Sequence, residues 1–226
     1  MIWEDKGYLL SKNKYNENSV IADFFTEKNG KVVGVIFGAS SKKIKNYLQI
    51  GNKFHLNYNS KADGRIGYFK IEIDSVTTPY YLENKLKLSC IIYCMSLIKL
   101  LTVENQENRK VYIIINDFFN LIKEENWIKN FILWELHLYK IVGYDINFNN
   151  YVFNEKVNGV NKFFVQSNSQ KRTIPEFLIN KNIDPKNKDE IFEGLKLVGD
   201  FLNKSILKPN NINFPNSRIE FLNKFK

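Results

Sequence analysis

Lysines are interleaved with aromatic residues across residues 28–70, and together they can bind a nucleic-acid strand. Cations neutralise phosphates and flat rings stack on bases, which are the two contacts of a sequence-tolerant single-strand site. The window holds nine basic residues against one acid, Asp63, a balance of +8 out of a formal net charge of +9 for the chain. The basic residues are Lys28, Lys31, Lys42, Lys43, Lys45, Lys53, Lys61, Arg65 and Lys70.

A subset of these residues forms the predicted DNA-binding site. Phe37 is predicted to stack on a base, and the predicted phosphate contacts are Lys31, Lys42, Lys43, Lys45, Lys61 and Arg65. A structural interpretation stays open for each feature. Other rings of the window, such as Phe54, Tyr58, Tyr68 and Phe69, are of the kind that fills a small barrel, and the lysine-rich loop expected at residues 40–45 would be solvated in any case.

Few residues of the sequence are candidates for a catalytic role. The two histidines, His55 and His137, lie far apart in the sequence, and we interpret both as structural. The glycine-rich motifs that bind nucleotide phosphates are missing, and the carboxylates do not cluster as the metal ligands of a nuclease would. Cys90 and Cys94 lie one helical turn apart in an apolar run, which favours buried free thiols. We expect no enzyme activity, no zinc and no other cofactor.

The composition is that of a folded protein of one or two domains. Of 226 residues, 44% are hydrophobic and 25% are charged. The longest apolar stretch, residues 90–98, is about half of the ~20 residues that a membrane-spanning helix needs. The N-terminal residues do not show the order of a secretory signal. We therefore expect a cytoplasmic protein without a membrane partner.

The basic window lies in a region whose pattern predicts strands. Short β-branched or aromatic runs, separated by clusters of Asn, Gly and Ser, predict about five strands in residues 1–79. Along residues 53–59 apolar and polar residues alternate, which places Phe54, Leu56 and Tyr58 on one face. Five strands in about 80 residues favour a closed barrel of the OB-fold type.

The pattern becomes helical after Pro79. Apolar residues at intervals of three and four predict a buried helix from Leu82, a second helix at residues 111–124 and a third that Gly143 ends. The predicted fold class is α+β: an OB-fold barrel at 1–79, an all-helical domain at 80–208 and a basic tail at 209–226. An irregular insert at about 147–172, a loop or small hairpin, precedes a short helix from Thr173 and another at residues 189–207. No zinc module is expected.

Short motifs follow one another in a recognisable order. They include Trp3-x-Asp5-x-Gly7, Thr26-Glu27-x-x-Gly30-Lys31, Gly38-Ala-Ser-Ser-Lys42, Leu48-Gln49-x-Gly51-Asn52, Trp134-Glu135-Leu136, Gly143-Tyr144 and Pro215-x-x-Arg218. This order resembles that of the bacterial RecO family of recombination mediators over nearly the whole chain. No single motif is specific; their order and spacing carry the resemblance.

The resemblance implies an N-terminal OB-fold, a helical domain and a role in DNA repair at the bacterial nucleoid. Members of the family bind single- and double-stranded DNA, anneal complementary strands and engage the acidic C-terminal tail of single-stranded-DNA-binding protein. With RecR they let the RecA recombinase load, and none of these steps requires nucleotide hydrolysis. Some members carry a four-cysteine zinc module, but here the first expected cysteine falls near Tyr151 and none follows.

Residues and resemblance together predict a recombination mediator. Its barrel cations would screen two phosphate backbones at once and so lower the repulsion that slows annealing. Grooves between helices, flanked by Arg109, Lys110, Lys129 or Lys140, would receive the acidic tail. Two alternatives stay open. One is a protein-interaction scaffold that does not bind DNA and whose charge reflects A/T-rich codon usage, and the other is an RNA-binding OB-fold protein.

Overall fold

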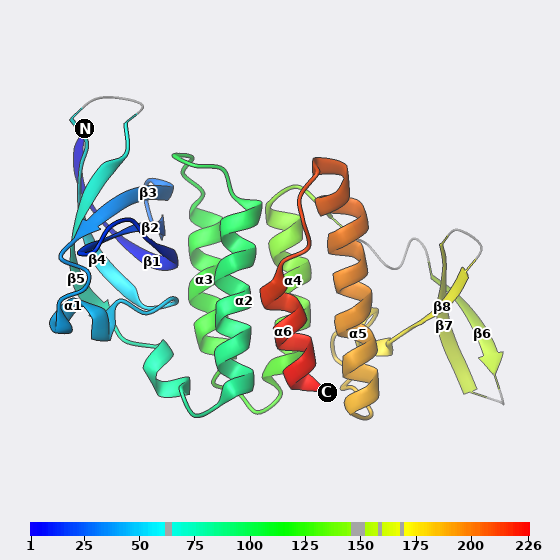
Figure 1. Ribbon diagram of the computed structural model, residues 1–226. Helices are drawn as coiled ribbons and strands as arrows, with labels where there is room; N and C mark the ends of the chain where they lie inside the picture. Colours follow the sequence, from blue (N-terminus) through cyan, green and yellow to red (C-terminus); the bar gives the residue numbers. More distant parts are fainter. Residues whose placement is uncertain (62–64, 146–151, 158–159, 168–169) are drawn as a thin grey trace. The chain divides into compact units, whose positions relative to one another are not determined.

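The computed structural model describes residues 1–61, 65–145, 152–157, 160–167 and 170–226. Its contacts divide the chain into two compact units, and Figure 1 labels the helices and strands of both. The barrel unit comprises residues 1–115 and 215–225, and the second unit comprises residues 116–214 with Lys226. Within the described ranges, no helix has the length and apolar character that crossing a membrane requires.

Five strands of the barrel unit form a closed barrel. They are β1 (Ile2–Lys14), β2 (Ser19–Thr26), β3 (Gly30–Phe37), β4 (Lys53–Asn59) and β5 (Gly67–Ser75). The strand order is β1-β2-β3-β5-β4, and β4 pairs with β1 to close the ring. β3 and β5 pair in parallel, whereas the other pairs of the barrel are antiparallel. The predicted five-stranded, OB-like barrel is confirmed.

Alternation along the strands sends every second side chain into the barrel. The prediction that Phe54, Leu56 and Tyr58 share one face is confirmed, because all three lie in the barrel core together with Phe69. β3 passes the ring of Phe69 at Gly34, where a β-carbon would lie only 2.5 Å from that ring. Three aromatic residues of the basic window therefore fill the core.

A long helix follows the barrel within the same unit. The one-turn helix η1 (Thr78–Tyr81) leads into α2 (Lys85–Leu101), and the side chain of Asn84 caps the first turn of α2. α2 packs against β1 and is buried on most of its surface, as its apolar pattern predicted. Cys90 and Cys94 are buried in this helix as thiols that are not joined in a disulfide, which confirms their interpretation.

The C-terminal residues of the barrel unit form α6 (Asn216–Phe225), where the sequence predicted a basic tail. α6 packs against α2, and its Phe221 and Phe225 are buried. Arg218 is also buried, with its guanidinium carbon 5.0 Å from the centroid of the ring of Tyr93. The prediction of a tail was wrong because these buried residues recur every three or four positions, a helical period hidden among lysines and asparagines.

The second unit contains the end of α3 and two further long helices. α3 (Arg109–Leu121) and α4 (Trp127–Ile141) were both predicted, and Gly143 has a φ of +99° just beyond the end of α4. α5 (Lys188–Phe201) packs against α4. In the described part of this unit, the short helices are η3 (Glu176–Leu178), the π-helical turn η4 (Leu202–Leu207) and η5 (Lys208–Asn210).

A small antiparallel sheet occupies the position of the predicted loop or hairpin. Its strands, in the order β6-β7-β8, are β6 (Val152–Val157), β7 (Val160–Ser167) and β8 (Gln170–Ile174). Phe153 and Phe164 are partners across β6 and β7, with stacked rings 6.0 Å apart, a contact that stabilises strand pairing. Three parts of the predicted insert, 147–151, 158–159 and 168–169, lie outside the described residues.

The fold class is α+β, as predicted. The region after the barrel is mostly helical and not all-helical, because β6, β7 and β8 interrupt it. The helix expected from Thr173 is also wrong: Thr173 belongs to β8, and Pro175 separates that strand from a single 3₁₀ turn. Whether residues 1–79 and 80–208 fold as separate domains stays a prediction, since the contact-based units divide after residue 115.

Candidate nucleic-acid interface

The outer face of β3 and β5 presents an aromatic pair to solvent. Ile36 and Phe69 point into the core, so their neighbours Phe37 and Tyr68 point outward. Phe37 is 59% exposed, and its ring centroid lies 5.9 Å from that of Tyr68. We call these two residues the aromatic pair. The sequence predicted a binding role for Phe37 but not for Tyr68, although the alternation along β5 places Tyr68 outside the barrel.

The loop between β4 and β5, which leads into the strand of Tyr68, carries two exposed cations. Lys61 and Arg65 are both exposed, and the Ser60 hydroxyl donates a hydrogen bond to the Arg65 carbonyl oxygen at 3.1 Å, which ties the two ends of the loop together. Asp63, the single acid of the basic window, lies outside the described residues. In OB-folds, the corresponding loop is one of the segments that bind oligonucleotides. A strand stacked on the aromatic pair would therefore have cations near its phosphates.

Three further predicted cations, Lys42, Lys43 and Lys45, are exposed on α1 (Lys42–Tyr47), between β3 and β4. The sequence predicted a loop at this point. That prediction was wrong, because a serine caps the helix and Ile44 packs against the barrel core. The three lysines therefore project from a short helix that is anchored on the barrel.

Lys12, which sequence analysis did not select, increases the positive charge beside α1. Its ammonium group donates a hydrogen bond to the carbonyl oxygen of Leu48, just after the end of the helix. Burial and, to a smaller extent, the charge of Lys45 lower the pKa of Lys12. Cations that repel one another in this way favour an anion between them.

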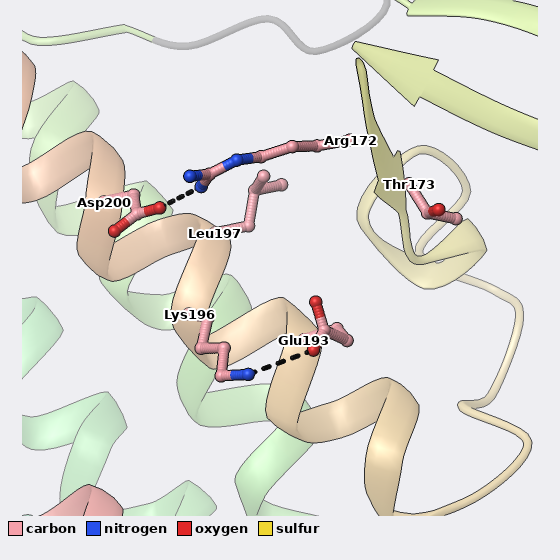
Figure 2. A pocket seen from close by; sticks show the side chains of 6 residues that line it. All are labelled: Arg172, Thr173, Glu193, Lys196, Leu197 and Asp200. Carbon is pink, nitrogen blue, oxygen red and sulfur yellow. Dashed lines mark hydrogen bonds and ion pairs between the residues drawn. The ribbon is translucent and has the colours of Figure 1, made fainter. Parts of the chain in front are cut away.

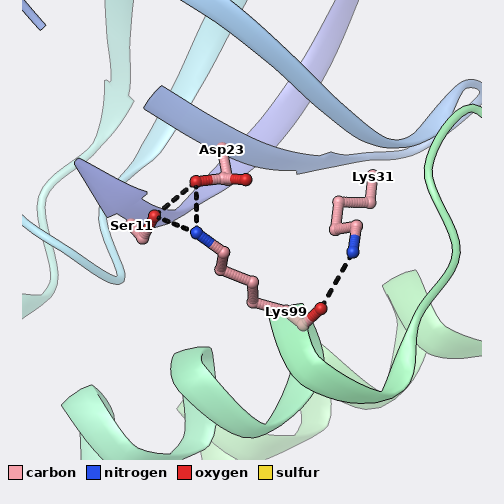
Figure 3. Close-up of polar contacts among 4 residues, drawn as sticks. All are labelled: Ser11, Asp23, Lys31 and Lys99. Atoms are coloured by element: carbon pink, nitrogen blue, oxygen red, sulfur yellow. Dashed lines mark hydrogen bonds and ion pairs between the residues drawn. The ribbon is translucent and has the colours of Figure 1, made fainter. Parts of the chain in front are cut away.

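Lys31 differs from the other predicted phosphate contacts because it faces α2. It is only 9% exposed, and its Nζ donates a hydrogen bond to the carbonyl oxygen of Lys99 at 2.9 Å (Figure 3). Burial lowers the pKa of Lys31, although the carboxylates of Glu104 and Asp23 act in the opposite direction. In this structure Lys31 is therefore a structural lysine at the C-terminal end of a helix, where a cation is favourable.

The side chain of Lys99 on α2 also contacts the barrel. Its Nζ lies 2.8 Å from a carboxylate oxygen of Asp23 on β2 and 2.9 Å from the hydroxyl of Ser11 on β1 (Figure 3). The Ser11 hydroxyl also donates to the Asp23 carboxylate. The side chain of Asp23 is 6% exposed. Helix α2 thus covers one side of the barrel, whereas the aromatic pair is open.

Comparison with known families agrees with this geometry. Residues 1–74 match the family model "Recombination protein O N terminal", and residues 82–188 match "Recombination protein O C terminal". The chain belongs to the RecO family. It is therefore a DNA repair and recombination protein of a family of non-enzymatic recombination mediators. DNA binding and recombination partners are properties that the RecO family implies.

Several bacterial relatives carry the name DNA repair protein RecO. The protein from Ehrlichia chaffeensis is 30% identical over 149 residues, which are 65% of this chain and 60% of the relative. Those from Rhodospirillum centenum and Bartonella quintana are 19% and 23% identical, and they match all of this chain and 95% and 98% of their own lengths. A solved structure of Entamoeba histolytica asparaginyl-tRNA synthetase matches 95% of this chain and 59% of its own, with 11% identity and a TM-score of 0.30, which is too low to indicate a shared fold.

In this RecO-family chain, His55 belongs to an ion cluster on the barrel. Its Nε2 lies 2.8 Å from Oδ1 of Asp74, which also accepts a hydrogen bond from Lys6 at 2.9 Å. Burial by itself raises the pKa of Asp74, but the hydrogen bond from Lys6 and the charges of Lys6, Lys53 and His55 outweigh it and hold that pKa below its usual value. His137 is exposed on α4. Across the described ranges, no three His, Cys, Asp or Glu side chains are placed to hold a metal ion.

The four cations predicted beside an acidic-tail groove differ in their surroundings. Arg109 and Lys110 are exposed at the start of α3. Lys129 is buried on α4 and donates to Asp184 at 2.7 Å, and Lys140 pairs with a neighbouring carboxylate at 3.0 Å. Two of the four therefore already hold acids of their own unit. The position of the tail groove in this chain stays a prediction.

A cavity of about 620 Å³ lies between β8 and α5 in the second unit (Figure 2). Its charged lining residues form ion pairs with one another: Arg172 with Asp200, and Lys196 with Glu193 at 3.2 Å. A ligand would have to separate these pairs. The cavity thus presents both positive and negative side chains, and it is a weaker candidate for binding phosphates than the open side of the barrel.

Proposed function

We propose that this chain is a recombination mediator that binds single- and double-stranded DNA and anneals complementary strands. The observation that carries the proposal is the aromatic pair of exposed Phe37 and half-buried Tyr68 on the outer face of an OB-like barrel, with the exposed Lys61 and Arg65 in the loop that leads into the strand of Tyr68. Rings supply stacking, worth about 1–3 kcal/mol per base, and the cations supply attraction to phosphates without reading sequence. RecO-family membership supports DNA as the ligand.

Annealing requires two phosphate backbones to approach each other, and the barrel has two groups of cations. One strand lies across the aromatic pair and the cations of the loop between β4 and β5. The lysines of α1, Lys42, Lys43 and Lys45, screen the second backbone. Lys31 does not take part, because it is buried against α2. Screening lowers the repulsion between the strands, so complementary bases meet more often.

The proposed partners are those of a mediator at the bacterial nucleoid. With RecR, the chain helps to load RecA onto DNA that is covered by single-stranded-DNA-binding protein, and it engages the acidic C-terminal tail of that protein. The exposed Arg109 and Lys110 at the start of α3 support an acidic partner by charge alone. The helical residues would thus serve partner docking while the barrel holds DNA.

A competition assay tests the proposal against its alternatives. The full chain is bound to a fluorescent single strand, and unlabelled single-stranded DNA, RNA of the same sequence or an acidic tail peptide is added. We expect single-stranded DNA to displace the label best. Preference for RNA favours the RNA-binding alternative, and the absence of any nucleic-acid binding favours the protein scaffold. Hydrolysis of DNA by the pure protein with Mg²⁺ would overturn the non-enzymatic mechanism.

The triple change Lys42→Glu, Lys43→Glu, Lys45→Glu tests the role of α1 in the same assay. We expect annealing to slow and single-strand binding to weaken, with a log-log salt slope smaller by about 2, because each phosphate contact contributes about 0.7. A matched control reverses three other exposed lysines, Lys204, Lys208 and Lys224, at the same change in net charge. An unchanged slope and annealing rate in the α1 variant, or an equal loss in the control, would contradict the assignment.

A further inference from the structure

Three large apolar side chains are exposed at one end of the barrel. Met1 is 68% exposed, Ile2 77% and Ile66 61%. Hydrogen bonds hold their backbones together, because the Ser60 nitrogen donates to the Met1 carbonyl oxygen at 2.9 Å and the Ser60 hydroxyl donates to the carbonyl oxygen of Arg65. We call Met1, Ile2 and Ile66 the apolar tip. Exposed apolar residues are ordinary singly, but a group of them indicates a binding surface.

The apolar tip continues the surface of the aromatic pair. Ile2 of β1 is the partner of Asn59 on β4, and Asn59 is the partner of Tyr68 on β5. Trp3 stacks on Tyr58 with ring centroids 4.8 Å apart and packs against the core, so Ile2 points outward, on the same face as Tyr68. A strand that leaves the aromatic pair in this direction reaches the apolar tip.

The charges beside the apolar tip match a nucleic acid. Lys61 follows Ser60, Arg65 precedes Ile66, and both cations are exposed. The end of a DNA duplex is complementary to this surface. The face of its last base pair is apolar, as the tip is, and its two backbones are anionic, opposite in charge to Lys61 and Arg65. Inserted Ile, Met and Leu side chains are known to stack against base steps in proteins that kink DNA. Charge complementarity and continuity with the aromatic pair therefore favour a duplex end as the occupant.

We propose that the apolar tip stacks on the terminal base pair of a duplex, so that the barrel binds the junction between single- and double-stranded DNA. The proposal rests on the proposed function, because the unpaired strand lies across the aromatic pair and the paired segment begins at the tip. Lys61 and Arg65 then lie near the backbones where the strands separate. During annealing, this is the position at which a newly formed base pair is covered and kept from water.

The experiment compares three fluorescent DNAs of equal nucleotide number: a hairpin with a single-stranded overhang, a single strand and a blunt duplex. Anisotropy titrations of the full chain are expected to give an affinity for the overhang hairpin about tenfold above that for either other DNA. In the double variant Ile2→Asn, Ile66→Asn this preference is expected to disappear, while the affinity for the single strand stays within about twofold. A 2-aminopurine in the terminal base pair should report stacking only with the unaltered tip.

The matched control carries the same substitutions at two isoleucines of the barrel unit that lie outside the tip. Ile113→Asn and Ile219→Asn change side chains that are 50% and 46% exposed, and the junction preference should survive. Equal affinity of the unaltered chain for all three DNAs, or a preference that persists in the tip variant, overturns the proposal. Binding to vesicles of phosphatidylcholine and phosphatidylglycerol that is lost in the tip variant, with no junction preference, would assign the tip to a membrane instead.

Phe37→Ala separates failure of this proposal from failure of the proposed function. If the barrel holds the single strand, Phe37→Ala weakens binding to the single strand and to the overhang hairpin alike, whereas the tip variant affects only the hairpin. Tyr80→Ala, at a tyrosine that is 81% exposed beyond the barrel, is the control. Unchanged single-strand binding in Phe37→Ala would contradict the strand face itself. Intact single-strand binding without a junction preference contradicts the apolar tip alone.

Discussion

On the side of the barrel that α2 covers, Lys31 and Lys99 donate hydrogen bonds to protein groups, whereas on the open side, where the loop between β4 and β5 leads into the strand of Tyr68, Lys61 and Arg65 are exposed. The covered side contains a buried carboxylate, Asp23, that neutralises Lys99. The open side contains the aromatic pair beside its cations. The same residue types therefore stabilise the fold on one side and are available to a ligand on the other.

This difference shows that net charge in a sequence window is not the charge of a surface. A cation that is removed from water must gain a partner, because burying an unpaired charge is costly. Lys31 gains the carbonyl oxygen of Lys99, and the buried carboxylate of Asp23 gains the partly exposed ammonium group of Lys99. These partners come from segments that are far apart in sequence. Substitutions on the open side should therefore change DNA binding and leave stability unchanged, and substitutions on the covered side should do the reverse.

Charge reversal on the open side is expected to have the largest effect. Lys61→Glu with Arg65→Glu should weaken single-stranded DNA binding on the order of 100-fold at low salt, because two attractive phosphate contacts become repulsive. Both side chains are exposed, so the free energy of unfolding should change by less than about 0.5 kcal/mol. Fluorescence anisotropy and urea denaturation measure the two quantities. Lys31→Met is the contrasting variant: it should leave the salt slope intact, and a slope reduced by about 0.7 would place Lys31 on DNA after all.

On the covered side, Asp23→Ala is expected to lower the free energy of unfolding by about 2 kcal/mol. The change leaves Lys99 without its carboxylate and Ser11 without its acceptor. DNA affinity, measured where the variant is still folded, should stay the same. Asp117→Ala at an exposed position of α3 is the control and should cost much less. If the Asp23→Ala variant were fully stable but bound DNA poorly, the covered side would have a role in DNA binding, and the two sides would not differ in function.

The cluster of Lys6, His55 and Asp74 provides a smaller, pH-dependent test. The pKa of Asp74 lies below its usual value, so its contribution to stability is fully present above the unfolded-state pKa of 3.8 and is lost as the pH falls through the folded-state pKa. Asp74→Asn should therefore lower the free energy of unfolding at pH 7 by up to about 1 kcal/mol.

Urea denaturation of both proteins at pH 7 and pH 3 measures this effect. The difference between them should narrow at pH 3, which is below the unfolded-state pKa of 3.8, so that the unfolded chain already binds the proton that the folded carboxylate resists. Glu4→Gln, at an exposed carboxylate of β1, controls for a general change of charge. A difference that stays constant between the two pH values would show that Asp74 does not act through its charge.

Much of the barrel was predictable from the sequence because its determinants are local. Alternation over residues 53–59 places Phe54, Leu56 and Tyr58 in the core, and a glycine after an apolar stripe ends α4 at Gly143. The ordered motifs also predicted the RecO family, which the family models confirm. The serine cap and the two residues of this helix that pack on the barrel, Ile44 and Tyr47, were a weaker local signal, and the sequence prediction of a loop was wrong.

The sequence by itself determined the strand pattern, the long helices and the family, since side-chain period and motif order are properties of neighbouring residues. Only the tertiary structure decided which lysines reach solvent. Lys31 is 68 residues from the carbonyl oxygen that it contacts, and Asp23 is 76 residues from Lys99. The packing of α6 against α2 is likewise a contact between distant segments. Availability of a charge depends on what packs over it, and the residues that surround it in the sequence do not encode that packing.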